Sequence, residues 1–441
     1  MSTVAATDAE LVAPAADQAP VRAQLFERVY DTTSKTVALT FDSDWWSTGD
    51  VATVLRILRE NGITAGFALT GRYAERYPDQ TRAIVAAGHK LINHSYDHPD
   101  FCTLNADQRC GQLRRAEDEF ARVGGTSDGW FRAPYRACYA IDSLNIDLAS
   151  CGYYINFDWT YDTLGYQSVP PAQILERVRT RTVPGTIILM HLGDESTDTA
   201  ALPSIISTLR EMGYGFTDPG GAVTRGTIGA KYAQLGAQRS VLGVPCTGEM
   251  VATTAGTAVQ WFTRGRIYWH TDLGAYEVHG AILGKYRELG TVTSFLQFPT
   301  TDERATPDGI GRYNHFQGQG GSIYWSPSSG AHEVHGAIRS KWAALGWERG
   351  FLRYPISDEV AVTGGRASQF EGGNVYWSGP TGAHEVHGAI LGRYLQLGGS
   401  GSRLGLPVSD EYPISTGARS DFQHGWILWN RSTGATTVTY R

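Results

Sequence analysis

The stretch KTVALTFDSDWW, Lys35 to Trp46, joins a run of apolar and β-branched residues to two carboxylates and two tryptophans. The apolar run is typical of a strand that is buried on both faces of a parallel sheet. Asp42 and Asp44 come where this strand ends, and acidic side chains at the end of a buried strand indicate a functional site. The same combination of a strand and a polar strand end recurs through the first half of the chain.

Short apolar runs alternate with segments of helical spacing between Lys35 and Asp218. The strand candidates are KTVALTF, ITAGFALT, KLINHS, GWFRAPY, YYINFDW, TIILMH and YGFTD. Segments such as DVATVLRILREN and TALPSIISTLREMG separate them and have apolar residues on one helical face. This alternation predicts a parallel α/β sheet, either barrel-like or doubly wound.

The second half of the chain is an internal repeat. A Leu-x-x-Pro segment starts at Leu242 and recurs 54, 56 and 52 residues later, and GAYEVHGAI at Gly274 returns as GAHEVHGAI at Gly330 and Gly382. Paired aromatics, glycine turns and little helix predict a β-rich domain of four small sheets, for which we expect a propeller-like arrangement.

Composition limits the classes of partner and the location. The net charge is 38 − 44 = −6 without a basic block, which argues against nucleic acid, and no apolar run is long enough to span a membrane. Residues 1–30 are rich in alanine and proline and predict a flexible lead-in without a signal peptide. Cys102, Cys110, Cys138 and Cys151 predict disulfides of an exported protein, for which we expect Cys102 to pair with Cys110 and Cys138 with Cys151. Four buried free thiols are the alternative.

Polar side chains gather at the predicted carboxyl ends of five strands, where the sites of parallel α/β sheets lie. They are Asp42 and Asp44, His94 and His98, Arg132 to Tyr135, Trp159 and Asp162, and His191. His94 and His98 are four residues apart and can bind one ion, with a carboxylate from the first strand completing the ligand set.

A metal ion with a separate base and acid predicts hydrolysis of an acyl bond. The ion would polarise the carbonyl group and lower the pKa of its water. Asp42 would accept the proton of that water, the N–H of Tyr135 would bind the oxyanion, and His191 would protonate the leaving nitrogen.

These motifs resemble the polysaccharide deacetylases of carbohydrate esterase family four, from about Lys35 to Asp218. TFDSD is similar to the family's TFDD, HSYDH to its H(S/T)xxH, RAPY to RxPY and ILMH to LxH. The resemblance implies a distorted (β/α) barrel over 31–222, a divalent ion (zinc, with cobalt as the alternative) and release of acetyl groups from glycans. It makes Asp42 the base, His94 and His98 ligands and His191 the acid, with Arg132 orienting Asp42.

Two positions depart from the family pattern. Ser43 stands where the family has its metal carboxylate, so Asp44 must reach the ion, or water completes a two-histidine site. The acid that tunes the catalytic histidine is also displaced, and Asp162 is our candidate, with an ordinary turn residue as the alternative. Trp45, Trp46 and Trp159 are candidates for stacking on a sugar ring, with core packing as the alternative.

The repeats over 225–441 resemble LGFP repeats of actinobacterial cell-envelope proteins, which implies attachment to a wall glycan. We expect a secreted, wall-associated enzyme that removes N-acetyl groups from peptidoglycan or chitin oligomers. The alternatives are an O-acetyl esterase with the same site and a catalytically disabled wall-binding protein.

Overall fold

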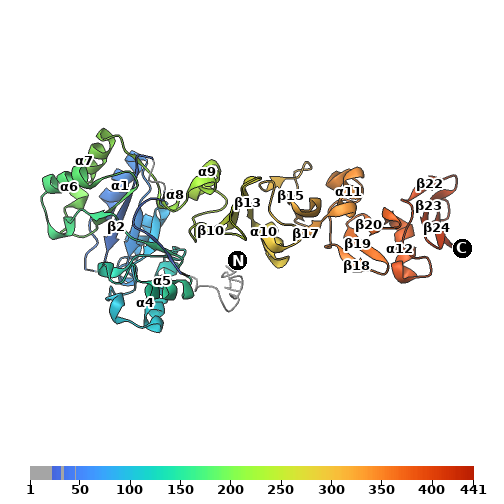
Figure 1. Cartoon of the computed structure of the whole chain (residues 1–441), viewed down its shortest axis with the longest axis horizontal. Helices are drawn as coiled ribbons and strands as arrows, with labels where there is room; N and C mark the ends of the chain where they lie inside the picture. The colour runs from blue at the N-terminus through green and yellow to red at the C-terminus, as the bar shows by residue number, and fades with distance from the viewer. Residues whose placement is uncertain (1–21, 31–33, 45) are drawn as a thin grey trace. The chain divides into compact units, whose positions relative to one another are not determined.

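The computed structural model describes residues 22–30, 34–44 and 46–441 and divides the chain into two compact units (Figure 1). The first unit is Met1–Met250 with Gln260–Thr263, and the second is Val251–Val259 with Arg264–Arg441. Within the described ranges, no helix combines the length and the apolar character that a membrane span requires.

The first unit is built on a nine-stranded sheet in which every recorded strand pair is parallel. The strand order is β1-β6-β5-β4-β3-β2-β8-β7, and β9 pairs with β2. The strands are β1 (Gln24–Phe26), β2 (Thr36–Ser43), β3 (Gly66–Leu69), β4 (Lys90–Asn93), β5 (Trp130–Phe131), β6 (Ile155–Phe157), β7 (Tyr161–Asp162), β8 (Thr186–His191) and β9 (Gly215–Phe216). The predicted parallel α/β sheet is confirmed.

The sheet is a half-barrel and is not closed by a full ladder. Its ends, β1 and β7, are not paired with each other in the described ranges. A single antiparallel bridge joins Arg28 to Thr186, and the N–H of Val29 donates to the carbonyl of Gly185 at 2.8 Å. Irregular backbone therefore links the chain after β1 to the start of β8. Strand β1 lies inside the range 1–30 that we assigned to the lead-in, so the folded unit begins earlier than that boundary.

In the described residues, seven helices connect the strands, and two more follow the last strand. They are α1 (Val51–Asn61), α2 (Gly71–Arg76), α3 (Pro78–Ala86), α4 (Ala106–Arg122), α5 (Asp142–Ser150), α6 (Pro171–Arg181), α7 (Asp198–Glu211), α8 (Pro219–Ala222) and α9 (Gly226–Gln234). Ala222, in α8, packs with Ala38 of β2 on the inner face of the half-barrel.

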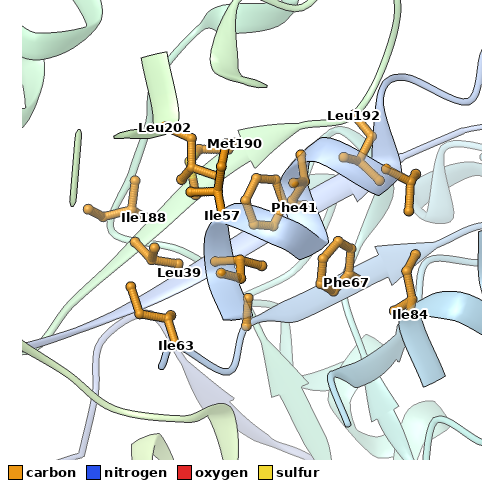
Figure 2. Packing of buried hydrophobic residues seen from close by; sticks show 14 of the residues in the cluster. Leu39, Phe41, Ile57, Ile63, Phe67, Ile84, Ile188, Met190, Leu192 and Leu202 are labelled. Atoms are coloured by element: carbon orange, nitrogen blue, oxygen red, sulfur yellow. The ribbon is translucent and has the colours of Figure 1, made fainter. Parts of the chain in front are cut away.

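Side chains of β2 alternate between two buried environments. Leu39 and Phe41 pack with Ile57 of α1 and Leu202 of α7 in the main apolar cluster (Figure 2). Burial of each such side chain contributes about 1.5–3 kcal/mol. Residues on the opposite face of β2 point into the half-barrel, and Asp42 lies on this face at its carboxyl end. The core thus holds one strand face rigidly and places the carboxylate on the other.

Two disulfides cross-link the segments that follow the strand ends. Cys102 pairs with Cys138 and Cys110 pairs with Cys151, so our expectation that sequence neighbours pair is wrong. Cys110 lies on α4, which packs against α5, and Cys151 is the residue that ends α5. Closing loops of 36 and 41 residues stabilises the fold by about 3–4 kcal/mol each.

Each repeat contributes a four-stranded antiparallel sheet whose strands follow one another in chain order. The strands are β10 (Met250–Val251), β11 (Thr257–Phe262), β12 (Gly265–His270), β13 (Gly274–His279), β14 (Arg304–Ala305), β15 (Arg312–His315), β16 (Ser322–Ser326), β17 (Gly330–Val334), β18 (Val360–Val362), β19 (Gly365–Phe370), β20 (Gly373–Ser378), β21 (Gly382–His387), β22 (Tyr412–Ile414), β23 (Gly417–Phe422), β24 (Gly425–Asn430) and β25 (Thr436–Tyr440).

A helix follows each of the first three sheets and packs on the next sheet. These helices are α10 (Gly280–Glu288), α11 (Gly336–Ala344) and α12 (Gly388–Gln396). Helix α10 contacts β16 and β17, and α11 contacts β20 and β21. The four small sheets that we predicted are confirmed. Their contacts join neighbours along the chain, and the propeller-like arrangement is not confirmed.

One hydrogen bond recurs in every repeat and fixes the Leu-x-x-Pro turn. An aromatic side chain on the preceding helix donates to the carbonyl oxygen of the residue that follows the leucine, two positions before the proline. The pairs are Tyr232 with Gly243 (2.8 Å), Tyr286 with Gln297, Trp342 with Arg353 (3.0 Å) and Tyr394 with Gly405 (2.7 Å). Tyrosine and tryptophan are interchangeable here because both have an apolar body and one polar donor.

Candidate active site

The structure brings the predicted strand-end residues to one cavity of about 470 Å³ in the first unit. Its lining includes Asp42, Ser43, Asp44, His94, His98, Tyr135, Trp159, Asp162, Tyr166 and His191. The expectation that these distant segments meet at the carboxyl ends of the strands is therefore met. Arg132 is fully buried and is not part of the lining.

Asp42 is held by a guanidinium that water does not reach. Its carboxylate is 5% exposed, and Nη1 of the fully buried Arg132 donates to Oδ1 at 2.5 Å. Arg132 also donates to the hydroxyl of Thr40 at 3.1 Å and to the carbonyls of Phe157 at 2.8 Å and Asp158 at 3.2 Å. A buried charge that is hydrogen-bonded on every side has one orientation, and so has the carboxylate paired with it.

The His94 and His98 rings converge with their Nε2 atoms 3.0 Å apart. Nδ1 of His94 is 3.0 Å from the carbonyl oxygen of Arg132, which fixes Nδ1 as the protonated nitrogen and leaves the Nε2 lone pair free to bind a ligand. Burial lowers the pKa of both histidines to about 3, so both rings are neutral near pH 7. Neutral imidazoles are the form that binds metal ions.

The donor set fits a divalent ion through its two imidazoles only. Asp44 lines the cavity, but its Oδ1 accepts the backbone N–H of Trp46 at 3.0 Å. Oδ2 of Asp42 is 3.6 Å from Nε2 of His94. Among the residues that the structure describes, no group of three histidine, cysteine or acidic side chains is arranged to hold an ion. The third ligand that we expected from Asp44 is thus not assembled.

Tyr135 occupies a short 3-10 turn, Pro134–Arg136, with a left-handed backbone (φ 56°). Its ring is 70% exposed and packs edge-on against His98 at 4.4 Å between centroids. The N–H groups that begin a helical turn have no partner within it, which leaves the Tyr135 N–H available to a ligand. Left-handed backbone of a residue other than glycine is strained and is held by its surroundings.

Arg136 follows Tyr135, and its two ion pairs hold this strained turn in place. Its Nε donates to Oδ2 of Asp158 at 2.6 Å, and its Nη2 donates to Oε1 of Glu27 at 2.5 Å. Burial raises the pKa of Asp158 to about 6. Asp158 was not among our candidates, although its position directly before Trp159 was a signal that we could have used.

His191 ends β8 and lies close to two acidic residues, Asp162 and Asp198. Its Nδ1 is 3.8 Å from Oδ1 of Asp162 and has no hydrogen-bond partner among the described residues. Burial lowers the pKa of His191 to about 4, and burial together with the charges of Asp42 and Asp198 raises the pKa of Asp162 to about 6. Asp162 is thus close enough to attract a protonated His191.

Asp198 and Tyr166 also contact His191 and were missed from the sequence. The backbone N–H of His191 donates to Oδ2 of the buried Asp198 at 2.9 Å, and the Tyr166 ring lies 4.6 Å from the imidazole. Asp198 begins α7 and reads as an ordinary first-turn acid, so only the fold reveals its contact. Tyr166 lies in an irregular segment, where no periodicity marks it.

The three tryptophan candidates differ in position. Trp159 lines the cavity, and the guanidinium of Arg136 lies 5.1 Å from its ring centre. Trp46 is 71% exposed and is not part of the cavity lining. Trp45 lies outside the described residues.

The fold and site together define the class of α/β enzymes whose reacting groups lie at the carboxyl ends of a parallel sheet. The polysaccharide deacetylase family model matches residues 30–154, and the LGFP repeat model matches 242–294, 296–350, 352–402 and 404–441. The chain belongs to the polysaccharide deacetylase family, whose members are hydrolases that act on N-acetyl amide bonds of glycans.

Several relatives place this assignment in context. A peptidoglycan-N-acetylglucosamine deacetylase of Bacillus cereus is 30% identical over 41% of this chain and 65% of its own length. A chitin deacetylase of Colletotrichum lindemuthianum is 31% identical over 40% of this chain and 75% of its own length. A solved Bacillus anthracis protein, described as a family pseudoenzyme, is 28% identical and covers 45% of this chain and 68% of its own, with a TM-score of 0.41. The chain thus spans less than two thirds of the Bacillus cereus relative.

Proposed function

We propose that the first unit is a metal-dependent polysaccharide deacetylase that hydrolyses N-acetyl groups of a wall or chitin-like glycan. The observation that carries this proposal is the single cavity shared by Asp42, the two facing imidazoles and His191. The named activities of the relatives, on peptidoglycan and chitin, support the same reaction.

His94 and His98 would hold the ion, with Asp44 or water completing its ligands. A divalent ion, zinc in our proposal and cobalt as the substitute, would polarise the acetyl carbonyl and lower the pKa of water. Oδ1 of Asp44 accepts the Trp46 N–H, so Asp44 would bind the ion through Oδ2 or give up that hydrogen bond.

The residues of the chain handle the proton and the oxyanion. Asp42, fixed by Arg132, accepts a proton from the attacking water, and the N–H of Tyr135 stabilises the oxyanion. His191 gives a proton to the leaving nitrogen, since an amine does not leave as an anion. Because the free His191 is neutral near pH 7, it must be protonated before it acts. The proton that Asp42 takes from the attacking water passes on to His191 and then to the leaving nitrogen, so that both residues return to their starting forms. Asp162 attracts the transient imidazolium.

We also propose that the protein is exported and that its repeats hold it on a wall polysaccharide. The two disulfides support an oxidising compartment. The similarity to LGFP repeats supports attachment to the wall.

Acetate release tests the catalytic proposal. The full chain is stripped with a chelator, reloaded with zinc or cobalt and incubated with N-acetylglucosamine oligomers and with peptidoglycan. We expect metal-dependent acetate, reduced about 10²- to 10⁴-fold in His191→Ala and unchanged in His424→Ala, an exposed histidine of the last repeat. An enzyme that releases acetate only from O-acetylated xylan is the esterase alternative. If metal-loaded protein frees no acetate from any of these glycans, the deacetylase proposal fails and the protein is the catalytically disabled wall-binding alternative.

A further inference from the structure

A histidine between two glutamates recurs where consecutive repeats meet in the second unit. Its Nδ1 contacts a glutamate of its own strand, and its Nε2 faces a glutamate of the next repeat. The sets are His279 with Glu277 (2.7 Å) and Glu303 (3.3 Å), His335 with Glu333 (2.8 Å) and Glu359 (3.6 Å), and His387 with Glu385 (2.8 Å) and Glu411 (3.5 Å).

A cavity of about 360 Å³ opens at the first of these junctions. It is lined by His279, Glu303, Arg312 and Trp325 and by the first turn of α10, Gly280 to Ile282. The corresponding residues at the next two junctions are His335, Glu359, Arg366 and Trp377, then His387, Glu411, Ala418 and Trp429. This volume is in the range of small-molecule sites.

The charges of the junction oppose one another. Oε1 of Glu303 is 3.9 Å from Nε of Arg312, and at the next junction Glu359 and Arg366 are 2.6 Å apart. The first two junctions therefore offer hydrogen-bond donors and acceptors with little net charge, whereas the third lacks the arginine. Such a lining suits hydroxyl and amide groups better than a phosphate or a free amine, which need an opposing charge.

A tryptophan lies beside the arginine, because Trp325 is the cross-strand partner of Arg312 and Trp377 is the partner of Arg366. Trp325 is only partly buried and borders the cavity, and the matching Trp377 and Trp429 are also partly buried. A half-exposed indole offers a flat apolar face beside polar groups. The helix starts with Gly280, where an added Cβ would meet no atom within 4 Å, so a ligand can approach the backbone there.

We propose that each junction pocket binds one neutral pyranose unit of a polysaccharide, with the ring against the tryptophan and its hydroxyl or acetamido groups on the glutamate, arginine and first helical turn. This inference rests on the proposed wall-glycan role of the repeats and names the site. The first two junctions carry the full set of groups, and the third has Ala418 in place of the arginine. Several such sites that bind one polymer gain affinity through effective concentration.

The residue at the position of His279 varies between repeats, and the variation agrees with a residue that pairs with a glutamate of the pocket. In the first unit Arg225 precedes the helix that corresponds to α10, and its Nη2 pairs with Glu249 at 3.2 Å. Glu249 occupies the position of Glu303 in the repeat. A guanidinium can replace the imidazole as a partner of the glutamate, whereas it could not replace a metal ligand.

Titration of the full chain carrying His191→Ala, which prevents turnover, tests the proposal. The probes are the neutral hexamer of N-acetylglucosamine and the fully deacetylated cationic hexamer. We expect the triple variant Trp325→Ala, Trp377→Ala, Trp429→Ala to bind the neutral hexamer at least about 10-fold more weakly. Trp426→Ala, a tryptophan outside the pocket lining, is the matched control and should bind like the parent.

A second set of variants covers the case in which removal of the indoles disturbs the sheets. Ala281→Gln, Ala337→Gln and Ala389→Gln place bulk at exposed positions of the helix starts and should weaken binding similarly. Equal affinity of the parent and both triple variants, or tighter binding of the cationic hexamer, overturns the inference.

Acetate release separates this test from the catalytic one. With His191 intact, Trp426→Ala, which lies outside the pocket lining, should release acetate from a soluble hexamer at the parental rate. A parent that releases no acetate but loses hexamer binding in the triple variants refutes the deacetylase and supports the pockets.

Discussion

Replacement of Arg132 by methionine should be among the most damaging single changes in the first unit. The guanidinium is fully buried and its partners include the carboxylate of Asp42 at 2.5 Å. Methionine fills much of the volume but leaves that carboxylate buried without a counter-ion. Breaking a buried pair from one side costs about 3–5 kcal/mol. For a unit of this size the cost corresponds to a fall in Tm of about 6–20 °C.

The double variant Asp42→Asn, Arg132→Met shows whether the unpaired charge is the cause. Asparagine carries no charge, so the double variant should be more stable than Arg132→Met alone, although neither releases acetate. Thermal unfolding of the parent, both single variants and the double variant gives the coupling energy. A Tm for Arg132→Met within 2 °C of the parent, or no recovery in the double variant, would refute this reading of the buried pair.

Two further predictions concern packing and pH. Gly165→Ala should lower the free energy of unfolding of the first unit, measured in urea, by about 1–3 kcal/mol and should reduce acetate release, because its Cβ would lie 2.2 Å from the Asp198 carboxylate. Gly111→Ala, whose Cβ would have no atom within 4 Å, should instead stabilise α4 by about 0.5–1 kcal/mol. Equal effects at both positions would contradict the packing. For His279, burial disfavours the charged ring, but the hydrogen bond to Glu277 and the nearby acidic charges outweigh burial and raise its pKa. The contribution of His279 to stability is complete below the unfolded pKa of about 6.5 and is lost as pH rises through the folded pKa. Hydrogen exchange of the α10 amides, corrected for the intrinsic exchange rates, should therefore be slower at pH 6 than at pH 8.5. His279→Gln should remove this difference.

The sequence predicted the parallel sheet and the convergence of its strand ends, because both follow from local patterns. Apolar runs set the strands, and parallel strands direct their carboxyl ends to one edge. Asp42, His94 and His191 were recoverable for this reason. The repeats were visible because each copy restates the same side chains at the same spacing.

Other features depend on approaches in space that no local pattern records. The disulfide pairing follows from the packing of α4 on α5, and β1 is too short to carry a periodic signal. Asp198 reaches His191 only because α7 begins beside the end of β8. The orientation of Asp44 is set beyond the last paired residue of β2, where strand geometry no longer determines the direction of a side chain.

The contacts between repeats also bear on how the array was built. Asp358 of the third repeat accepts from Lys285 of the first at 2.8 Å and from the backbone N–H of Glu333 of the second at 3.1 Å, and Asp410 has the same two kinds of donor one repeat later. The two middle copies therefore carry both the acceptor aspartate and the donor groups of the joint. Gene duplication of one whole unit would lengthen the array without the invention of a new interface, whereas an insertion of half a unit would leave these partly buried acids unmatched. Variation in repeat number among related genes should therefore occur in whole steps.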